Sequence, residues 1–374
     1  NMPDDLRSAV EFAERLRFSG DQKGIVRELD DTHADRISHY FAQSGMRISR
    51  NLTPKISDAL DVVCSRLSIN SDSVRAYVYS APEVQAGCFA GSKAECIIRV
   101  SSGLINLMSN EELGFVLGHE FGHFLLGHNL SNMDHGQSTE HFINQRGREI
   151  SADRLGLTAC QSLEVATRSL MKTTSGLNDN LLRFDVGAFL SQMRSQRGTI
   201  AYADDGDTHP SLLMRCRALL WFSMSDAYCA IKGTTGGESL AKIDSRITRD
   251  MDRYIDGPAR ERIAEAREGV IVWLAACASV RDGALDKSEQ DIIERLVGQE
   301  TLEKLLEFYS DCSRSEVEKI TREKLLEAVS IYEQIAPQEF STRFGEIQNQ
   351  ISAEFEQPDF SSFLSGFIES RSDN

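Results

Sequence analysis

The sequence lacks the features that would place it in a membrane or on nucleic acid. No stretch approaches the roughly 20 apolar residues that a membrane-spanning helix needs. The longest candidate, residues 269–280, ends before Arg281 and Asp282 and predicts a buried helix. Lysine and arginine number 41 against 57 aspartate and glutamate residues, so the formal net charge is −16. This excess of negative charge disfavours binding to DNA phosphates or anionic lipids, and we expect neither a nucleic-acid partner nor a membrane span.

Two further absences bear on the cellular compartment. The first five residues lack the basic and apolar regions of a secretory signal. The eight cysteines include no C-x-x-C pair, and a chain of 374 residues can bury a core without a disulfide scaffold. We therefore expect reduced thiols and a cytoplasmic location.

The spacing of apolar residues predicts a mainly helical protein. Residues 4–67 have the pattern of successive amphipathic helices, which Gly20 and Gly45 interrupt. Residues 74–80 and 96–100 have the character of strands, and we expect them to share one small antiparallel sheet. Beyond about residue 257 the pattern is helical throughout. The expected fold class is mainly α with a small antiparallel β-sheet, of the α+β type, followed by an all-α C-terminal domain.

Caps and loops predict the helix limits near the centre of the chain. Ser109 or Asn110 caps a helix that we expect to run through His128. The stretch 129–140 is rich in Gly, Ser and Asp and predicts a loop. Another helix begins near His141.

The central signal is His-Glu-Phe-Gly-His at residues 119–123, an H-E-x-x-H motif. Residues four apart lie on one face of a helix, so His119 and His123 can both reach one zinc ion. Glu120 lies beside that face, where its carboxylate can accept a proton from water activated by the metal. The alternative is an ordinary core helix with an accidental motif, but burying two histidines and a glutamate without partners would be costly. We predict one Zn²⁺ per chain.

A catalytic zinc site needs a third protein ligand. The pattern H-E-x-x-H-x-x-G-x-x-H is excluded, because Leu126 and Asn129 stand where it requires glycine and histidine. His128 follows His123 by five residues, roughly 140° around a helix. We therefore expect His128 to point away from the metal, and to serve in packing or behind the ligands.

The next predicted helix supplies candidates for the missing ligand. Glu149 is the candidate third ligand. Asp153, one turn later on the same face, can accept a hydrogen bond from a ligand imidazole and fix its tautomer. A Glu and an Asp four residues apart on a helix usually form a solvated face, but no other third ligand follows the H-E-x-x-H motif here.

Together, these motifs resemble those of the HtpX and CAAX-prenyl-protease family of gluzincin zinc metallopeptidases. The likeness lies in residues 119–123 and in residues 149–156, where Glu149, Ala152, Asp153 and Gly156 match the family's second motif. Residues 88–104 are similar to the family's edge strand and the short helix after it. The resemblance implies that a polypeptide substrate binds as an extended strand beside the metal.

A third segment of the resemblance is Thr208-His209-Pro210-Ser211 with Arg215. In the family this histidine and this arginine lie near the metal. The resemblance implies that His209 and Arg215 stabilise the oxyanion of the reaction or that they reversibly occupy the open metal position. The alternative for His209 is a helix-start residue beside Pro210.

The C-terminal region has a weaker signature. Residues 273–289 are similar to the helix–Asp-Gly–helix pattern of TerB-like domains. Asp286 and Glu289 have the spacing of a capping box, and the alternative is cation binding by Asp282, Asp286 and Glu289. We favour capping, and we expect the domain to recruit a protein partner or to restrain the peptidase.

The predicted organisation has three parts: an N-terminal helical segment (1–50), a zinc metallopeptidase domain (51–240) and a TerB-like helical domain (258–374). The predicted function is that of a soluble zinc-dependent endopeptidase. The alternative is a zinc-bearing adaptor or chaperone-like module that binds polypeptide and rarely cuts. Glu120 argues against the alternative, because a pure binder needs no general base. A thiol switch through Cys88 could impose latency, but a small buried residue is the simpler interpretation.

Overall fold

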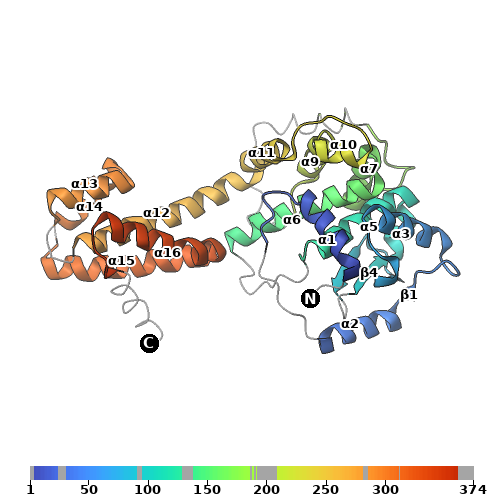
Figure 1. Ribbon diagram of the computed structural model, residues 1–374, viewed down its shortest axis with the longest axis horizontal. Coiled ribbons are helices and arrows are strands. Elements are labelled where there is room, and N and C mark those ends of the chain that lie inside the picture. The colour runs from blue at the N-terminus through green and yellow to red at the C-terminus, as the bar shows by residue number, and fades with distance from the viewer. Residues whose placement is uncertain are drawn as a thin grey trace. The chain divides into compact units, whose positions relative to one another are not determined.

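The chain folds into two units, each of which is mainly helical (Figure 1). The first unit comprises residues 1–134 and 143–255, and the second comprises residues 135–142 and 256–374. In this computed structural model, the described residues are 4–23, 31–90, 95–128, 138–185, 188, 191, 209–280, 285–310 and 312–360.

Helices make up most of the first unit. Those that lie wholly or mostly in it are α1 (Asp4–Leu16), α2 (Asp31–Ser44), α3 (Pro54–Arg66), η1 (Ser71–Ser73), α4 (Ser102–Leu107), α5 (Asn110–Leu125), α6 (Thr139–Cys160), α7 (Leu163–Ser175), α9 (Leu212–Ser223), α10 (Asp226–Ile231), α11 (Leu240–Met251) and the π-helical turn η3 (Asp252–Asp256). Its strands are β1 (Met46–Arg47), β2 (Val74–Tyr79), β3 (Ala86–Ala90) and β4 (Cys96–Ser101). The fold class expected from the sequence is confirmed.

One detail of the sheet corrects the expectation. Among the described residues the strands form one sheet in the order β1-β2-β4-β3. The two runs foreseen as strands, β2 and β4, pair in parallel, so the sheet is mixed and not purely antiparallel. The reason is β3, which lies between them in the chain and pairs antiparallel with β4 at the edge. Two reversals of chain direction leave β4 parallel to β2.

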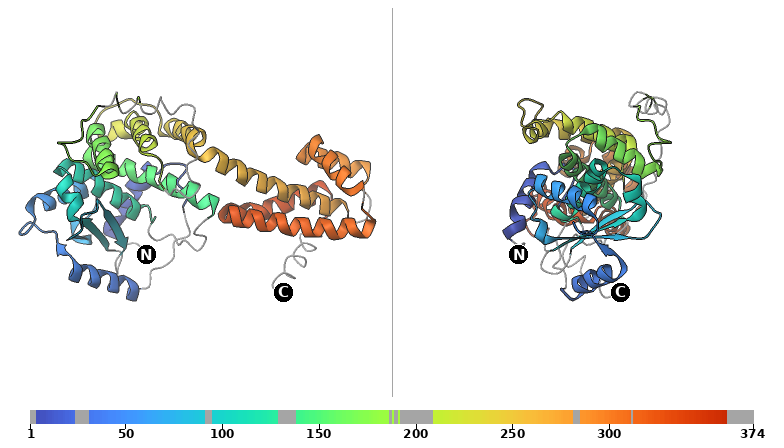
Figure 2. Two further views of the ribbon diagram at one scale, coloured as in Figure 1. Left: turned by 180° about the vertical axis from the view of Figure 1, so that it is seen from behind. Right: turned by 90° about the vertical axis from the view of Figure 1, so that its right-hand side faces the viewer.

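The sheet separates helix α2 from helices α3 and α5 (Figures 1 and 2). Alternate residues of a strand point to opposite faces. Ile97 of β4 packs with Phe41 of α2 and with Tyr77, whereas Ile98 and Val100 belong to the core that includes α5. All three β4 side chains are fully buried. Burying each of them contributes about 1.5–3 kcal/mol to the stability of the sheet.

Helix α5 lies in the middle of this core. Its first turn is closed by a capping box, in which Ser109 Oγ accepts from the N–H of Glu112 and Glu112 accepts from the N–H of Ser109. The helix packs closely on α6 at Gly122, where a Cβ atom would lie only 2.8 Å from Cα of Ala152. This close approach brings a side chain of α6 within reach of the histidines on α5.

The second unit is a bundle of helices (Figure 2). Helix α12 packs against α15 and α16, and α13 packs against α12 and α14. The bounds are α12 (Gly257–Ser279), α13 (Lys287–Val297), α14 (Gln299–Ser310), α15 (Arg314–Ile335) and α16 (Pro337–Glu354). Asp286 and Glu289 form the expected capping box at the start of α13.

The apolar stretch foreseen as a buried helix is the C-terminal half of α12. Val270, Leu274 and Ala275 are fully buried there. Within the part of the chain that the structure describes, no helix combines the length and the apolar character needed to cross a membrane.

Candidate metal centre

Three side chains from two helices converge at the centre of the first unit. Nε2 of His119 lies 3.1 Å from Nε2 of His123, both on α5. Glu149 reaches them from α6, with Oε1 at 3.3 Å from Nε2 of His123 and Oε2 at 3.6 Å from Nε2 of His119. The structure thus brings together the three residues that the sequence put forward as ligands.

The chemistry of this donor set fits a zinc ion. Zinc with bonds of about 2.0–2.1 Å in a tetrahedral arrangement separates its donor atoms by about 3.3 Å, close to the spacings found here. Oε2 of Glu149 is buried and has no hydrogen-bond partner among the described residues. A bound cation would satisfy that oxygen. The group His119, His123 and Glu149 is the one set of three or more possible ligands that converges in the described part of the chain.

The environment of Glu149 keeps this residue charged. Burial alone would raise the pKa of its carboxyl. The hydrogen bond with His123 and the charges of His119, His123 and Arg215 outweigh burial and hold the pKa well below its usual range. A carboxylate that is already ionised can bind a cation without first releasing a proton.

Asp153 holds His119 from behind. Its Oδ1 lies 3.0 Å from Nδ1 of His119, the ring nitrogen that faces away from the donor atoms. Arg215 of α9 forms two hydrogen bonds to the same carboxylate, from Nε at 2.8 Å and from Nη2 at 2.6 Å. Burial works against the charge of Asp153, but Arg215 and His119 outweigh it and lower its pKa. The charged carboxylate fixes the tautomer and the direction of the His119 ring.

A different group holds His123. Nδ1 of His123 lies 2.9 Å from Nδ1 of His128, and Nε2 of His128 lies 3.0 Å from Oδ2 of Asp21. Burial lowers the pKa of His128 to about 4, although Asp21 acts in the opposite direction. At neutral pH the His128 ring is therefore uncharged.

The position of His128 corrects the expected helix end. Helix α5 stops at Leu125, and Gly127 adopts a left-handed conformation with φ of 72°. Glycine favours this conformation and commonly ends helices. The chain therefore turns back, and His128 lies behind the ring of His123, the place expected for it, although the helix does not extend to it.

Glu120 follows His119 on α5 and is close enough to His123 and to Cys88 of β3 to act on both. The residue is partly buried. Burial raises the pKa of the Cys88 thiol well above its usual range, and Cys96 and Glu120 add to the effect. Cys88 is 6% exposed and is therefore a buried, protonated thiol.

His209 lies at the open side of the group. Its side chain is 63% exposed, and Nε2 lies 3.5 Å from Oε1 of Glu149. Arg215 is only 16% exposed, and its Nη2 lies 3.6 Å from Oε2 of Glu149. The structure thus places both residues beside Glu149, with His209 toward solvent and Arg215 toward the interior.

Some sequence predictions lie outside the described residues. Thr208, Asp282 and residues 129–137 of the loop predicted after His128 belong to this group. The sequence analysis did not identify two residues that support the site. Asp21 contacts His128, and Arg17 forms an ion pair with Asp21. No local pattern marks them, because they lie far from the histidines along the chain.

Comparison with known proteins agrees with this chemistry. The model of Peptidase family M48 matches residues 51–145, which include His119, Glu120 and His123. The chain is 24% identical over 201 residues to Metalloprotease YcaL of Escherichia coli, covering 54% of this chain and 66% of that protein. It is 43% identical over 118 residues to Metalloprotease LoiP of the same organism, covering 30% of this chain and 45% of that protein.

A plant relative extends the comparison. The chloroplastic plastoglobule-localized metallopeptidase 48 of Arabidopsis thaliana is 29% identical over 146 residues, which cover 34% of this chain and 42% of that protein. The chain thus spans less than two thirds of the length of each of these relatives. All three are metallopeptidases by name. No solved structure matches the chain. The family match and the named relatives support a metal-dependent peptidase.

Proposed function

We propose that the chain is a zinc-dependent endopeptidase in which His119, His123 and Glu149 hold the metal. The observation that carries the proposal is the convergence of three donor atoms on one point, together with a Glu149 oxygen that lacks a hydrogen-bond partner among the described residues. A Zn²⁺ ion bound by such a set would act as a Lewis acid on a peptide carbonyl and would make water more acidic.

Glu120 is the proposed general base. Glu120 follows His119 directly on α5, and its charge acts on His123 and on Cys88 of β3. It accepts a proton from the attacking water and returns that proton to the nitrogen of the departing amine. His209, exposed beside Glu149, donates a hydrogen bond to the oxygen that becomes negative as the carbonyl is attacked.

Arg215 has a role of a different kind in this proposal. Both of its hydrogen bonds to Asp153 are short, and its side chain is mostly buried. We propose that Arg215 acts through Asp153, which it keeps charged behind His119. The contact with the developing oxyanion, which the resemblance implied for both residues, is then assigned to His209.

The substrate class follows from strand β3. This strand is at the edge of the sheet, it pairs with β4 among the described residues, and α5 packs against it. An edge strand offers backbone N–H and C=O groups to an added strand. We propose that an extended polypeptide pairs with β3 and so passes the metal site.

The decisive experiment is the variant Glu120→Gln in the full chain. Purified parent and variant are incubated with denatured casein, with and without a chelator, and their zinc content is measured. The parent should cleave in a chelator-sensitive way, and the variant should bind zinc without cleaving. Glu111→Gln makes the same change at an exposed position on the same helix and should leave cleavage intact.

Two outcomes would count against the proposal. Cleavage that survives Glu120→Gln would remove Glu120 from the mechanism. A zinc-loaded parent that binds casein and leaves it intact would favour the polypeptide-binding adaptor. A regulatory or partner-recruiting role of the second unit, its TerB-like character and a cytoplasmic location remain predictions.

A further inference from the structure

A chain of hydrogen bonds leads from His123 into the N-terminal part of the first unit. It runs from Nδ1 of His123 through His128 to Oδ2 of Asp21, with separations of 2.9 and 3.0 Å. The side chain of His128 is 5% exposed and that of Asp21 is fully buried. Burying a carboxylate is costly unless its charge is paired or hydrogen-bonded, and His128 is one of the partners of Asp21.

The direction of each hydrogen bond follows from the role of His123. An imidazole that binds a metal through Nε2 carries its proton on Nδ1. Nδ1 of His123 therefore donates to Nδ1 of His128, which accepts. A ring that accepts at Nδ1 carries its proton on Nε2, so His128 donates from Nε2 to Asp21. The hydrogen bond to His128 thus fixes the tautomer of His123, and the hydrogen bond to Asp21 fixes the tautomer of His128.

Asp21 is itself held in place by Arg17. Nη1 of Arg17 lies 3.0 Å from Oδ1 of Asp21. Nη2 of the same guanidinium donates to the carbonyl of Leu126, the residue that caps the end of α5, at 2.9 Å. Arg17 therefore ties the carboxylate to the helix that carries both histidines.

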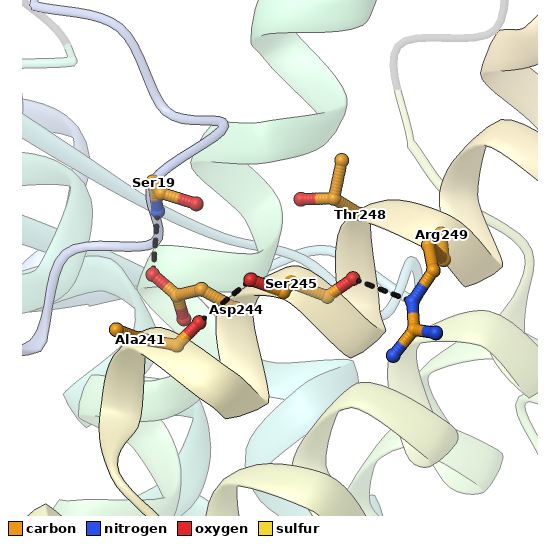
Figure 3. Close-up of a pocket in the computed structure, with 6 residues that line it drawn as sticks. All are labelled: Ser19, Ala241, Asp244, Ser245, Thr248 and Arg249. Atoms are coloured by element: carbon orange, nitrogen blue, oxygen red, sulfur yellow. Dashed lines mark hydrogen bonds between the residues drawn. The ribbon is translucent and has the colours of Figure 1, made fainter.

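The backbone around Asp21, residues 17–22, donates three hydrogen bonds to side chains of neighbouring helices. Figure 3 shows one of them, from Ser19 to Asp244, which both line a surface pocket. The three acceptors belong to α6 and α11. The N–H groups of residues 18, 19 and 22 donate to Oγ of Ser151, Oδ2 of Asp244 and Oδ1 of Asn144 at 3.0, 2.9 and 2.8 Å. The segment is thus fixed to the same helix α6 that supplies Glu149.

We propose that His128 and Asp21 are positioning residues of the metal site. They orient the ring of His123 and hold its Nδ1 proton, and residues 17–22 complete a site whose metal ligands all come from α5 and α6. This inference rests on the proposed function in one respect, namely that His119, His123 and Glu149 bind a metal. It assigns to an N-terminal segment a part in holding that metal.

The test uses the variants Asp21→Asn and His128→Gln in the full chain. The zinc dissociation constant is measured by competition with a chromophoric chelator, and the absorption spectrum of the cobalt-loaded protein reports on ligand geometry. Loss of an outer partner typically weakens metal binding 10–100-fold. We expect about 10-fold for Asp21→Asn and about 10–100-fold for His128→Gln. The double variant should bind no more weakly than His128→Gln alone, because Asp21 acts through His128.

The control is Asp250→Asn. Asp250 accepts hydrogen bonds from Arg217 and Trp221 in the same unit, and none of these three residues is a proposed metal ligand. It should lower the unfolding temperature and leave zinc affinity unchanged. Unchanged affinity in both test variants, or additive losses in the double variant, would overturn the inference. A parent that binds no zinc would instead overturn the proposed function.

A measurement on the unmodified protein covers the case in which a variant fails to fold. In the zinc-loaded parent labelled with ¹⁵N at histidine, a scalar coupling across the N–H···N hydrogen bond should join Nδ1 of His123 to Nδ1 of His128. A merely structural contact between the rings would give no such coupling. Its absence in the zinc-loaded protein would refute the inference without any substitution.

Discussion

The two histidines proposed as metal ligands, His119 and His123, lie one turn apart on the same helix, yet they are held from behind in different ways. His119 faces the carboxylate of Asp153 directly, and that carboxylate is ion-paired with a buried arginine. His123 faces an uncharged ring, His128, and the carboxylate of Asp21 lies one ring further out. His119 therefore has a carboxylate in direct contact with its ring, whereas the carboxylate nearest His123 on this path, that of Asp21, is separated from it by the ring of His128.

This difference predicts how sensitive the two sides of the site are to substitution. The His119 side comprises Asp153 and Arg215, and the His123 side comprises His128 and Asp21. Electrostatic interaction falls with distance, so a carboxylate in contact with a ligand ring acts on it more strongly than one beyond a second ring. Breaking the pair of Asp153 and Arg215 also leaves a buried cation without its main partner. Arg17, the cation beside Asp21, would instead keep its ion pair with Glu14. Substitutions on the His119 side should therefore cost more, in both stability and metal affinity, than those on the His123 side.

The largest effect should come from Glu149→Gln, which removes the proposed metal ligand that both sides share. A neutral amide is a poor substitute for the carboxylate, and zinc affinity should fall by more than the roughly 100-fold limit for outer partners. In this background Asp153→Asn and Asp21→Asn should make no further difference to metal content. Elemental analysis of the dialysed proteins measures this. A Glu149→Gln protein with one zinc per chain would show that the ligand is another residue.

Next in size is Asp153→Asn. Removing one partner of a buried ion pair costs about 3–5 kcal/mol, and the metal-free protein should lose about that much free energy of unfolding at pH 7. Urea unfolding followed by circular dichroism measures the change. A loss as small as that of Asp21→Asn would contradict the proposed difference between the two sides.

The free energy of unfolding that Asp153 contributes depends on pH. The pKa of Asp153 in the folded protein lies below its ordinary value of 3.8. The carboxylate therefore contributes stability that is fully present above about pH 4 and that is lost as the pH falls through the folded-state pKa. The difference in unfolding free energy between parent and Asp153→Asn should be largest near neutral pH and should shrink in acid. A difference that grows on acidification would exclude a charged Asp153.

Gly127→Ala should have an intermediate effect confined to the His123 side. Its φ of 72° lies in the left-handed region, where a Cβ costs about 1–2 kcal/mol. The strain should displace His128 and weaken zinc binding, while the signals of Asp153 and His119 in NMR spectra should stay in place. Gly176→Ala is a matched control, because Gly176 has a φ of 68° at the end of α7. It should cost similar stability without loss of zinc affinity.

The smallest effect should come from Ser109→Ala, which acts on both sides equally. It removes the capping box at the start of α5 and should cost about 1 kcal/mol of stability. Because the ligands lie two turns or more further along the helix, zinc affinity should be unchanged. Thermal unfolding and chelator competition measure the two quantities. A selective loss of zinc would mean that the helix start helps to position the histidines.

Much of the site follows from local spacing. His119 and His123 at i and i+4, and Glu149 and Asp153 at i and i+4, each need only one helix to lie on a common face. The prediction failed where the helix ended. Gly127 carried a signal for the turn, since glycine commonly follows the last helical residue, but extending the helix to His128 ignored that signal.

The sheet shows the same limit. The strand character of residues 74–79 and 96–101 is visible in the sequence, but their parallel pairing is not. Pairing depends on the position of β4 between β2 and β3, and that is decided by contacts between separate segments. The neighbours of a strand cannot be read from its own residues.

The sequence by itself determined which side chains could bind a metal, because helical periodicity relates residues that are close along the chain. Only the tertiary structure decided what stands behind those ligands. Asp21 and Arg215 lie far from His119 and His123 in the sequence, and they meet them through the packing of α6, α9 and residues 17–22 around α5. Burial then gives those charges their strength, because the interior screens them far less than water does.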